Sequence, residues 1–353
     1  MSTALQAGVK NPYLSRARRT LSLIIIRCSL IFLSVGYGQN QSQVVTPASA
    51  DSLLQAAAAL KQGVIVFNSN RTGNDEIYVM SADGSGVREL TNDDRYDSWW
   101  PRISPDRTQI LFYRSPKGVH DNDYTKQGLW VMGADGSSPR QVRAAGADGW
   151  NIQLHAEWSP DGKNLVMVGG QSFEKAHIYI TDQMGRNPRP LTSDKSSSSN
   201  HVDPSWSPDG KTIVFTACPT KKCSWNKLEV FIVPATGSQP PKRLTFDSVG
   251  DYDPYYSPDG RMIGWTSMVN NTGTHGIWNI RLAFADGSEV RFVTNDNNVN
   301  GYPAWSKDGK LMYFHRVVYG GSPNFGIYAI RPDGAGMKVI AGGEEGNDEY
   351  PST

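Results

Sequence analysis

The sequence predicts an all-β fold, a six-bladed β-propeller with four strands in each blade. Three observations support this prediction. A unit recurs along the chain at steps of 48 to 55 residues, each unit contains four short strand segments separated by turn signals, and the two ends of the repeat region complement each other. A four-stranded unit of about 40–50 residues repeated several times is typical of propellers.

The clearest copy of the unit lies near the middle of the chain. Its four strands are expected at residues 204–207, 212–216, 228–233 and 242–244, where β-branched and aromatic residues gather. Between the first two strands, residues 207–210 read Ser-Pro-Asp-Gly, which places Ser, Pro and Gly where a type I turn favours them. This stretch therefore gives the template for the other copies.

The repeat becomes visible when the copies are aligned on the residue expected just before the first strand. This landmark falls at Pro101, Ala156, Pro204, Pro254, Pro303 and Pro351. The third strand also appears six times, and four copies are followed by Asp-Gly, as at Asp83-Gly84, which is a strong hairpin signal. A parallel β-solenoid is the structural alternative, but its repeats are shorter and lack such hairpins.

The two ends of the repeat region predict how the ring closes. The last copy stops at Thr353, after the residues of a first strand, whereas the first recognisable strand, at residues 64–67, is a second strand without its first. We therefore expect the carboxyl end to supply the inner strand of one blade and residues 64–91 its outer three. Such closure removes the open sheet edge that would otherwise favour aggregation.

Two stretches carry a resemblance to a known family. Residues 69–91, which include Asn-Asp-Glu-Ile-Tyr-Val-Met-Ser-Ala-Asp-Gly, and residues 206–211, Trp-Ser-Pro-Asp-Gly-Lys, resemble the TolB-type propeller repeat, and the similarity extends over residues 63–353. The resemblance implies a bacterial periplasmic protein that binds other proteins, as in the Tol–Pal envelope system. The family also carries an α/β domain before the propeller, for which residues 51–62 leave no room.

The first 50 residues predict export. They contain five basic and no acidic residues, and the mostly apolar stretch at 21–35 is interrupted by Arg27. Ala48-Ser49-Ala50 is a candidate cleavage site, and cleavage near Gly38 is an alternative. We therefore expect an export signal or anchor at 1–50, a linker or short helix at 51–62 and the propeller at 63–353. The protein would then be periplasmic or secreted, with membrane contact only through its amino-terminal segment.

Charge and cysteine content agree with that location. The chain has 35 Lys and Arg against 34 Asp and Glu, so removal of residues 1–50 would leave a net charge of about −4. This balance argues against nucleic acid as a partner, because nucleic-acid binders carry a basic patch. Cys218 and Cys223 lie in one loop, where they predict a disulfide of the kind found in exported proteins.

The direction of the strands predicts two unlike faces. The Ser-Pro-Asp-Gly and Asp-Gly turns should share one face, and the long loops and blade-to-blade connections the other. The long loops are expected at residues 114–127, 169–176, 217–227, 267–276 and 316–326. Because function on a rigid scaffold gathers on long loops, we expect the binding surface on that face.

Polar and aromatic residues near the first strands are the candidate binding residues, since these strands line the channel. They are Asp97, Trp100, Arg102, His155, His201, Asp203, Asp251, Asp253, Tyr302 and Asp348. Carboxylates that converge on one mouth raise one another's pKa and attract a cation or a basic peptide. An Asp before a Pro can instead simply cap a turn. Trp99, Trp100, Trp150 and Trp225 fall outside the repeat pattern and could form a carbohydrate or peptide platform.

The sequence favours a binding module over an enzyme, because no catalytic motif accompanies the scaffold. The expected partner is a protein or peptide of the cell envelope, and no cofactor is predicted. The alternative is a carbohydrate-active lyase or hydrolase with a divalent cation in the channel. Its candidate catalytic residues are His155, Glu157, His201 and Asp203, because two histidines recur near acids in adjacent repeats.

Overall fold

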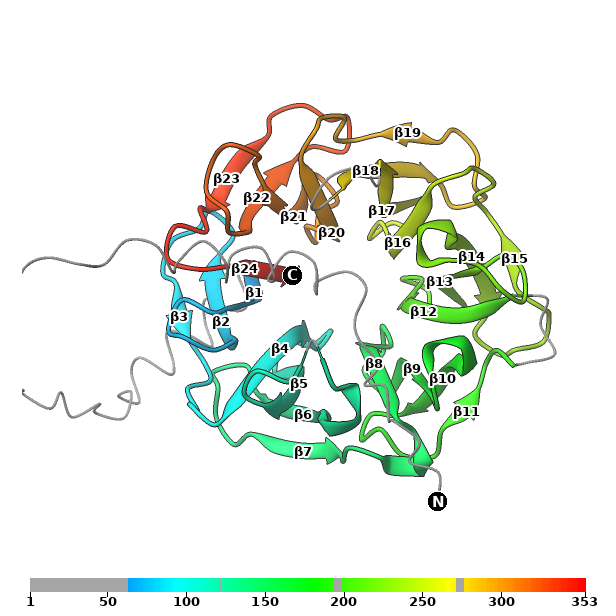
Figure 1. Cartoon of the computed structure of the whole chain (residues 1–353), viewed down its shortest axis with the longest axis horizontal. Helices are drawn as coiled ribbons and strands as arrows, with labels where there is room; N and C mark the ends of the chain where they lie inside the picture. The colour runs from blue at the N-terminus through cyan, green and yellow to red at the C-terminus, as the bar shows by residue number, and fades with distance from the viewer. Residues whose placement is uncertain (1–62, 121, 194–197, 271–275) are drawn as a thin grey trace, which may run out of the picture.

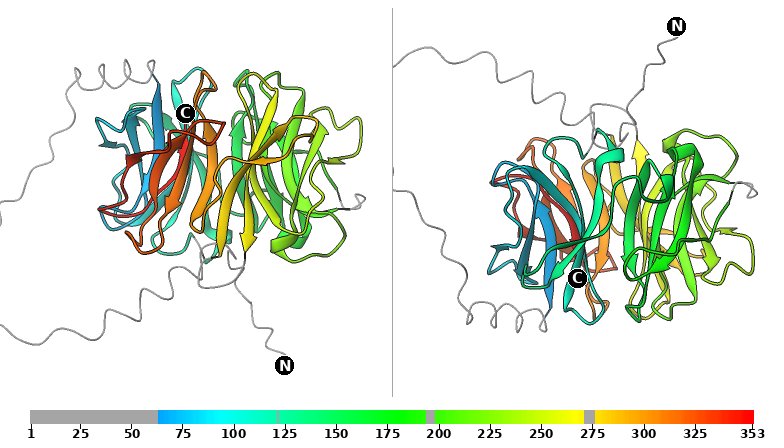
Figure 2. Two further views of the ribbon diagram at one scale, coloured as in Figure 1. Left: turned by 90° about the horizontal axis from the view of Figure 1, so that it is seen from above. Right: turned by 90° about the horizontal axis from the view of Figure 1, so that it is seen from below.

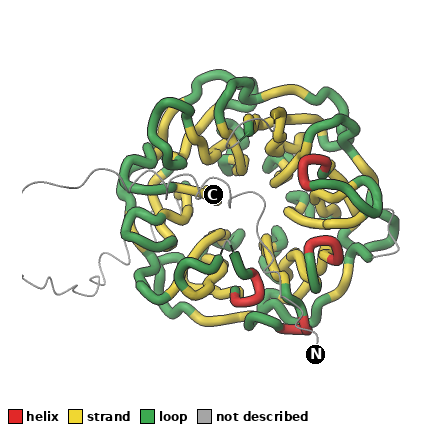
Figure 3. Tube along the Cα trace, in the orientation of Figure 1, coloured by secondary structure: helices red, strands yellow, loops and turns green. Residues whose placement is uncertain are grey.

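The computed structural model describes residues 63–353 except 121, 194–197 and 271–275. The predicted export segment and linker at 1–62 lie outside these residues. The described chain forms four-stranded antiparallel units arranged in a ring (Figure 1), with the strands running between two faces (Figure 2). The region enclosed by the innermost strands is called the channel below. Figure 3 shows that strands and loops make up nearly all of it. The fold is therefore the predicted all-β propeller with four-stranded blades.

Each unit begins with a strand beside the channel and continues outward (Figure 1). The innermost strands are β4 (Tyr96–Ile103), β8 (Ile152–Trp158), β12 (Ser199–Trp206), β16 (Gly250–Tyr256), β20 (Val299–Trp305) and β24 (Asp348–Ser352). The second strands are β1 (Val64–Ser69), β5 (Gln109–Pro116), β9 (Asn164–Gly170), β13 (Thr212–Cys218), β17 (Met262–Asn270) and β21 (Met312–Val317).

The outer two strands of each unit follow in the same order. The third strands are β2 (Glu76–Ser81), β6 (Gly128–Gly133), β10 (Ala176–Asp182), β14 (Glu229–Pro234), β18 (Ile277–Phe284) and β22 (Gly326–Ile330). The outermost strands are β3 (Arg88–Glu89), β7 (Arg140–Arg143), β11 (Arg189–Pro190), β15 (Lys242–Arg243), β19 (Arg291–Phe292) and β23 (Lys338–Ala341).

The described helical segments are short 3-10 turns, which are η1 (Tyr124–Lys126), η2 (Ala147–Gly149), η3 (Phe173–Lys175) and η4 (Trp225–Lys227). Three of them precede a third strand, in the loops that join β5 to β6, β9 to β10 and β13 to β14. Within the described residues, no helix combines the length and the apolar character needed to cross a membrane.

The predicted closure of the ring is confirmed. Strand β24, from the end of the chain, pairs antiparallel with β1, and the sheet order is β24-β1-β2-β3. Arg71 Nη2 donates a 2.6 Å hydrogen bond to Asp348 Oδ1, so a buried ion pair joins the two ends of the repeat region. No edge of β1 is left open.

The pairing divides the described strands into four sheets of four strands and one sheet of eight. The eight-stranded sheet has two antiparallel halves, β16–β19 and β20–β23. One parallel pair, Trp278 opposite Val299, links β18 to β20. The pairing alone therefore does not give the predicted six separate sheets.

The recurring Ser-Pro-Asp-Gly turn is stabilised by its own side chains. Ser207 Oγ donates to Asp209 Oδ1 at 2.7 Å and accepts from the Thr212 backbone N–H at 2.9 Å. Gly210, at φ 69°, donates its N–H to the Ser207 carbonyl, a geometry that favours glycine. The same bonds recur in the Ser159, Ser257 and Ser306 turns. The motif therefore fixes the turn between the first two strands.

The predicted first strands begin too late. Residues 204–207 were expected, whereas β12 spans Ser199–Trp206, and the other three strands of this unit begin and end within two residues of the prediction. Proline suggested a boundary because it cannot donate to a sheet ladder. The innermost strand is an edge strand with a bulge at the proline, and both settings tolerate proline.

Packing between neighbouring units forms the core. Second and third strands supply most of the fully buried apolar side chains, such as Ile65, Phe112, Phe215 and Phe314. The predicted disulfide between Cys218 and Cys223 is present and joins the two ends of a loop after β13.

Candidate functional site

Every innermost strand carries the same distortion, a bulge with a left-handed residue. On β4, Trp99 pairs with Tyr113 and Arg102 with Leu111, so two residues oppose one. The first bulge residue has positive φ, at 51–62°, in each case: Trp100, His155, Asp203, Asp253, Tyr302 and Tyr350. Such a conformation costs about 1–3 kcal/mol for a residue other than glycine. Its recurrence directs these six side chains toward the channel.

Three aromatic bulge residues pack together in the channel. The ring centroids of Trp100 and Tyr302 lie 4.8 Å apart, those of Trp100 and Tyr350 5.0 Å apart, and those of Tyr302 and Tyr350 5.1 Å apart. Trp100 and Tyr302 are buried. These distances are typical of favourable edge-to-face and tilted contacts, so the three rings fill this part of the channel.

The other bulge residues form a polar group beside the rings. The imidazole of His155 stacks on Trp100, with centroids 4.1 Å apart, and its Nδ1 lies 2.6 Å from Asp203 Oδ1. Asp203 Oδ2 accepts a hydrogen bond from the Thr216 hydroxyl at 2.8 Å. Burial and the neighbouring charge of Asp203 raise the pKa of Asp253 well above its ordinary value. The group therefore places a second buried carboxyl, that of Asp253, beside the His155–Asp203 pair.

Two residues beyond the bulge, a second polar group lies across the channel. Arg102 Nε contacts Glu157 Oε1, and Arg102 Nη2 donates to the Tyr255 hydroxyl at 3.2 Å. Tyr255 in turn donates to Glu157 Oε1 at 2.5 Å. Burial raises the pKa of Glu157, although Arg102 lowers it. The Arg102 guanidinium also lies 4.4 Å from the Trp100 ring and 4.8 Å from the Tyr302 ring, which links this group to the aromatic rings.

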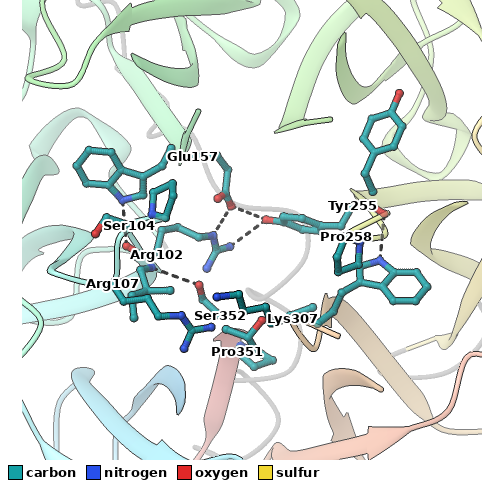
Figure 4. Close-up of a pocket in the computed structure, with 16 residues that line it drawn as sticks. Arg102, Ser104, Arg107, Glu157, Tyr255, Pro258, Lys307, Pro351 and Ser352 are labelled. Carbon is teal, nitrogen blue, oxygen red and sulfur yellow. Dashed lines mark hydrogen bonds and ion pairs between the residues drawn. The ribbon is translucent and has the colours of Figure 1, made fainter. Parts of the chain in front are cut away.

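This second group forms part of the wall of a pocket of about 340 Å³ (Figure 4). Its lining comprises Arg102, Ile103, Ser104, Pro105, Arg107, Glu157, Trp158, Tyr255, Tyr256, Pro258, Ala304, Trp305, Lys307, Pro351, Ser352 and Thr353. Three of these side chains are basic and one is acidic. A volume of this size accommodates a few side chains of a ligand.

The pocket opens on the face of the tight turns. Ser104, Pro105, Arg107, Pro258 and Lys307 all belong to turns between first and second strands. The long loops lie at the other end of these strands, because each second strand runs back across the sheet. The sequence placed the binding surface on the long-loop face, and the described pocket lies on the opposite one.

Two tryptophans of the pocket wall connect neighbouring units. Trp158 Nε1 donates to the Arg102 carbonyl at 3.2 Å, and Trp305 Nε1 donates to the Tyr255 carbonyl at 3.3 Å. Both tryptophans directly precede the serine of the turn in their repeats. They hold the innermost strands in place and line the pocket as well.

Six of the ten predicted binding residues meet in or beside the channel: Trp100, Arg102, His155, Asp203, Asp253 and Tyr302. The other four are buried elsewhere, where they join neighbouring strands and loops. They are Asp97, His201, Asp251 and Asp348, none more than 3 % exposed. Asp97, Asp251 and Asp348 therefore do not take part in the predicted convergence of carboxylates on one mouth of the channel.

The four buried residues each have local partners. Asp97 accepts from the Gly118 N–H at 2.6 Å and lies 3.4 Å from His120 Nδ1. Burial raises the pKa of Asp97, but hydrogen bonds from His120 and Gly118 outweigh it and leave the pKa below its ordinary value. Asp251 accepts from Ser267, and Asp348 from Arg71. They act within the blade junctions.

The alternative catalytic set does not gather at one point. His155 and Asp203 are paired in the channel, and Glu157 is held by Arg102 and Tyr255. His201 is fully buried between strands, where its Nδ1 lies 3.1 Å from the Ala176 carbonyl and its Nε2 lies 2.9 Å from the Ser198 hydroxyl. Equivalent sequence positions suggested a shared site, but the bulge points only His155 into the channel.

The proposed tryptophan platform is also not formed as expected. Trp99, Trp100 and Trp150 are each less than 9 % exposed and pack against other aromatic rings. Trp225 is only partly buried. The sequence did not single out Arg107 and Lys307 as binding residues. Both lie in turns between a first and a second strand and line the pocket. The departure of these two residues from the Ser-Pro-Asp-Gly consensus was the available signal.

Among the described residues, two groups have the composition of a metal site. One is Asp75, Asp97 and His120, all buried, and the other is Glu229, Asp247 and Asp251. In the first group, His120 lies between the two carboxylates, 3.6 Å from Asp75 and 3.4 Å from Asp97. A protonated imidazole would balance much of their charge, so this group is explained without an ion.

Comparison with known proteins agrees with the fold. No family model matches the chain. The chain is 32 % identical over 156 residues to an uncharacterised protein of Agrobacterium fabrum and 31 % identical over 156 residues to a TolB homologue of Chlorobium luteolum. These matches cover 44 % and 43 % of this chain, and 48 % and 31 % of the relatives. The chain thus spans about half the length of these relatives or less.

A solved structure gives the same result. TolB from Acinetobacter baumannii superimposes with a TM-score of 0.62 at 17 % identity, covering 87 % of this chain and 73 % of that one. At this identity the likeness concerns the fold. Together with the repeats and the closed ring, it makes the chain a TolB-like β-propeller.

Proposed function

We propose that this TolB-like β-propeller is an exported, six-bladed binding module that holds a segment of a partner protein in the pocket on its tight-turn face. The two antiparallel halves of the eight-stranded sheet count as separate blades in this proposal, which gives the six of the sequence repeat. The partner would be a protein of the cell envelope, and a role like that of TolB in the Tol–Pal system is the specific form of this idea.

The pocket is the observation that carries the proposal. Its wall combines Arg102, Arg107 and Lys307 with the single acid Glu157, and Trp158 and Trp305 supply aromatic surface. Arg102 is already bonded to Glu157, so the exposed ammonium group of Lys307 adds positive charge to the pocket wall. This chemistry fits a peptide segment with an acidic side chain and an apolar neighbour, rather than the basic segment that an acidic mouth would take.

Export is supported by two independent features. The amino-terminal 50 residues have the basic flank and apolar run of a signal, and the structure contains the Cys218–Cys223 disulfide. Disulfides persist in the periplasm and outside the cell, whereas the cytosol keeps thiols reduced.

A peptide-display selection on the purified full-length protein tests the proposal. We expect acidic peptides to be enriched, and Lys307→Glu to weaken their binding by about tenfold, or about 1.4 kcal/mol. Lys310→Glu is the matched control, because Lys310 belongs to the same turn, is 80 % exposed and does not line the pocket. Equal losses in both variants, or no enrichment of acidic peptides, would contradict the proposal.

The geometry gives less support to a carbohydrate-active enzyme, because His201 is buried between strands, away from the paired His155 and Asp203. Binding of a partner segment is therefore the function that the described site supports best.

A further inference from the structure

We infer that Glu229, Asp247 and Asp251 form a binding site for a divalent cation of the calcium type at the junction between β14 and β16. One carboxylate oxygen of each residue lies within 4.8 Å of those of the other two. Three carboxylates are ligands that hard cations such as Ca²⁺ prefer. The site lies on the long-loop face, away from the pocket, and the inference does not depend on the proposed function.

The carboxylate of Asp251 is the strongest indication of a missing ligand. Its Oδ1 accepts a 2.6 Å hydrogen bond from the Ser267 hydroxyl, whereas its Oδ2 is buried and has no hydrogen-bond partner. The residue as a whole is 0 % exposed. A buried carboxylate oxygen without a donor is costly, so a positive charge must reach it or the carboxylate must be neutral.

The neighbouring groups compensate the Asp251 carboxylate only in part: Thr245 and Arg281 lie near enough to lower its pKa, but the Thr245 hydroxyl donates to Glu229 Oε2. Glu229 accepts from Arg243 Nη2 at 2.7 Å and from the Thr245 hydroxyl at 2.6 Å, and Arg281 Nη1 donates to Asp247 Oδ2. Two guanidiniums therefore face three carboxylates, and neither of them donates to Asp251. A cation between the three carboxylates would balance the remaining charge.

The next junction along the ring provides an internal comparison. There Asn279, Asp296 and Asn300 occupy the positions of Glu229, Asp247 and Asp251. The two threonines show this correspondence. Thr294 Oγ1 accepts from the N–H of Ile280, directly after Asn279, as Thr245 Oγ1 accepts from the N–H of Val230, directly after Glu229. Asn300 Nδ2 lies 3.2 Å from Asn279 Oδ1 and 3.0 Å from Asp296 Oδ1. The amide hydrogens thus fill the gap that a carboxylate at position 251 leaves open.

The junction also gives a cation a route and a role. Asp247 is 40 % exposed, so the site is accessible to solvent on one side and water can complete the coordination. The backbone N–H of Asp251 donates to the Leu228 carbonyl at 2.8 Å. Leu228 lies in the connection between β13 and β14 that also contains the disulfide. A bound ion would therefore fasten the blade connection at 245–251 to that loop.

Thermal unfolding of the full-length protein, first stripped with a chelator, tests the inference. We expect 10 mM CaCl₂ to raise Tm by about 2–6 °C over NaCl of equal ionic strength, as for a site with Kd near 10⁻⁴–10⁻³ M. Asp247→Asn, which changes an exposed ligand, should abolish most of this rise. Asp296→Asn is the matched control at the neighbouring junction and should leave the rise unchanged.

A second variant guards against a result caused by misfolding. Asp251→Asn copies the Asn300 arrangement, so its amide can donate to Glu229 and Asp247. We expect it to be at least as stable as the wild type in chelator and to show no response to Ca²⁺. The inference is overturned if Ca²⁺ leaves the Tm of the wild type unchanged, which would mean that Asp251 is simply protonated. It is also overturned if the Ca²⁺ response survives in both variants.

Discussion

His155 Nδ1 lies 2.6 Å from Asp203 Oδ1, and the two residues occupy the same bulge position on neighbouring innermost strands. The pair exists because the left-handed bulge turns both side chains toward the channel, where Trp100 stacks on the imidazole. At the same position on the next strand, burial and the charge of Asp203 raise the pKa of Asp253 more than Arg102 lowers it. The channel therefore contains a carboxyl group that favours its protonated form.

We predict that Asp253→Asn stabilises the protein at neutral pH by about 1 kcal/mol. The folded-state pKa of Asp253 is raised, so the folded state binds a proton more tightly than the unfolded chain. The wild type then loses stability as pH rises from about 4, the ordinary Asp value, toward the raised pKa. Asparagine has no such penalty and tolerates positive φ.

Chemical denaturation between pH 3.5 and 8 measures this effect. The difference between variant and wild type should grow with pH and vanish at the acid end. Asp209→Asn is a control of opposite sign, because the Ser207 hydroxyl lowers the pKa of Asp209 and its stabilisation is lost as pH falls. A constant difference for Asp253→Asn would mean that folding does not raise the pKa of Asp253.

The Arg102–Glu157 pair should respond unequally to loss of either partner. Glu157→Gln leaves a buried guanidinium that cannot lose its proton, so we expect a cost of about 3–5 kcal/mol. Arg102→Met should cost less, because Glu157 can take up a proton. The free energy of unfolding of the Arg102→Met variant should therefore increase as pH falls from 8 to 5.

A double-mutant cycle with Arg102→Met plus Glu157→Gln checks the coupling by urea denaturation. The double variant should lose less than the sum of the single losses, since neither charge is then left unpaired. Additive losses would show that the two side chains act independently.

The ion pair that joins the ends of the ring offers a clean comparison. Arg71 contacts two acids, Asp348 at 2.6 Å and Glu345 at 3.6 Å, whose side chains are 2 % and 76 % exposed. We predict that Asp348→Asn costs about 1–3 kcal/mol, because it weakens a buried charged hydrogen bond. Glu345→Gln should change the free energy of unfolding by less than about 0.5 kcal/mol. Equal effects in thermal and urea unfolding would refute the distinction.

The disulfide should contribute modestly to stability. It closes a loop with a sequence separation of 5, for which loop entropy gives roughly 2 kcal/mol. The variant Cys218→Ser plus Cys223→Ser should therefore lose about that amount in urea denaturation. Intact-mass analysis should show a gain of two hydrogens in the wild type after reduction, and no change on reduction would mean that the bond had not formed.

The sequence contained enough information to predict the blades. Short turns such as Ser207 to Gly210 depend on local bonds between their own residues, so the motif predicts the turn and the strands on either side of it. Closure could also be predicted, because the missing first strand at residue 64 matched the surplus strand at the end of the chain.

The site was harder to predict because a bulge breaks the alternation of a strand. In a regular strand, Asp251, Asp253 and Tyr255 would point the same way, because they are two residues apart. In the structure, Tyr252 pairs with Thr266 and Tyr255 with Gly264, so residues 252 and 255 share a face and Asp251 lies on the other. The available signal was Pro254, directly after Asp253, because proline within a strand is typical of a bulge.

The pairing of β24 with β1 also has a consequence in time. β1 is among the first strands of the ring to be synthesised, and its partner β24 is the last. The ring therefore cannot close until Asp348–Ser352 has been synthesised. Every newly made chain thus passes through a stage in which β1 has been synthesised but β24 is not yet available to pair with it. Folding of the whole ring is thereby coupled to synthesis of Asp348–Ser352, and loss of this strand would leave an edge of β1 unpaired.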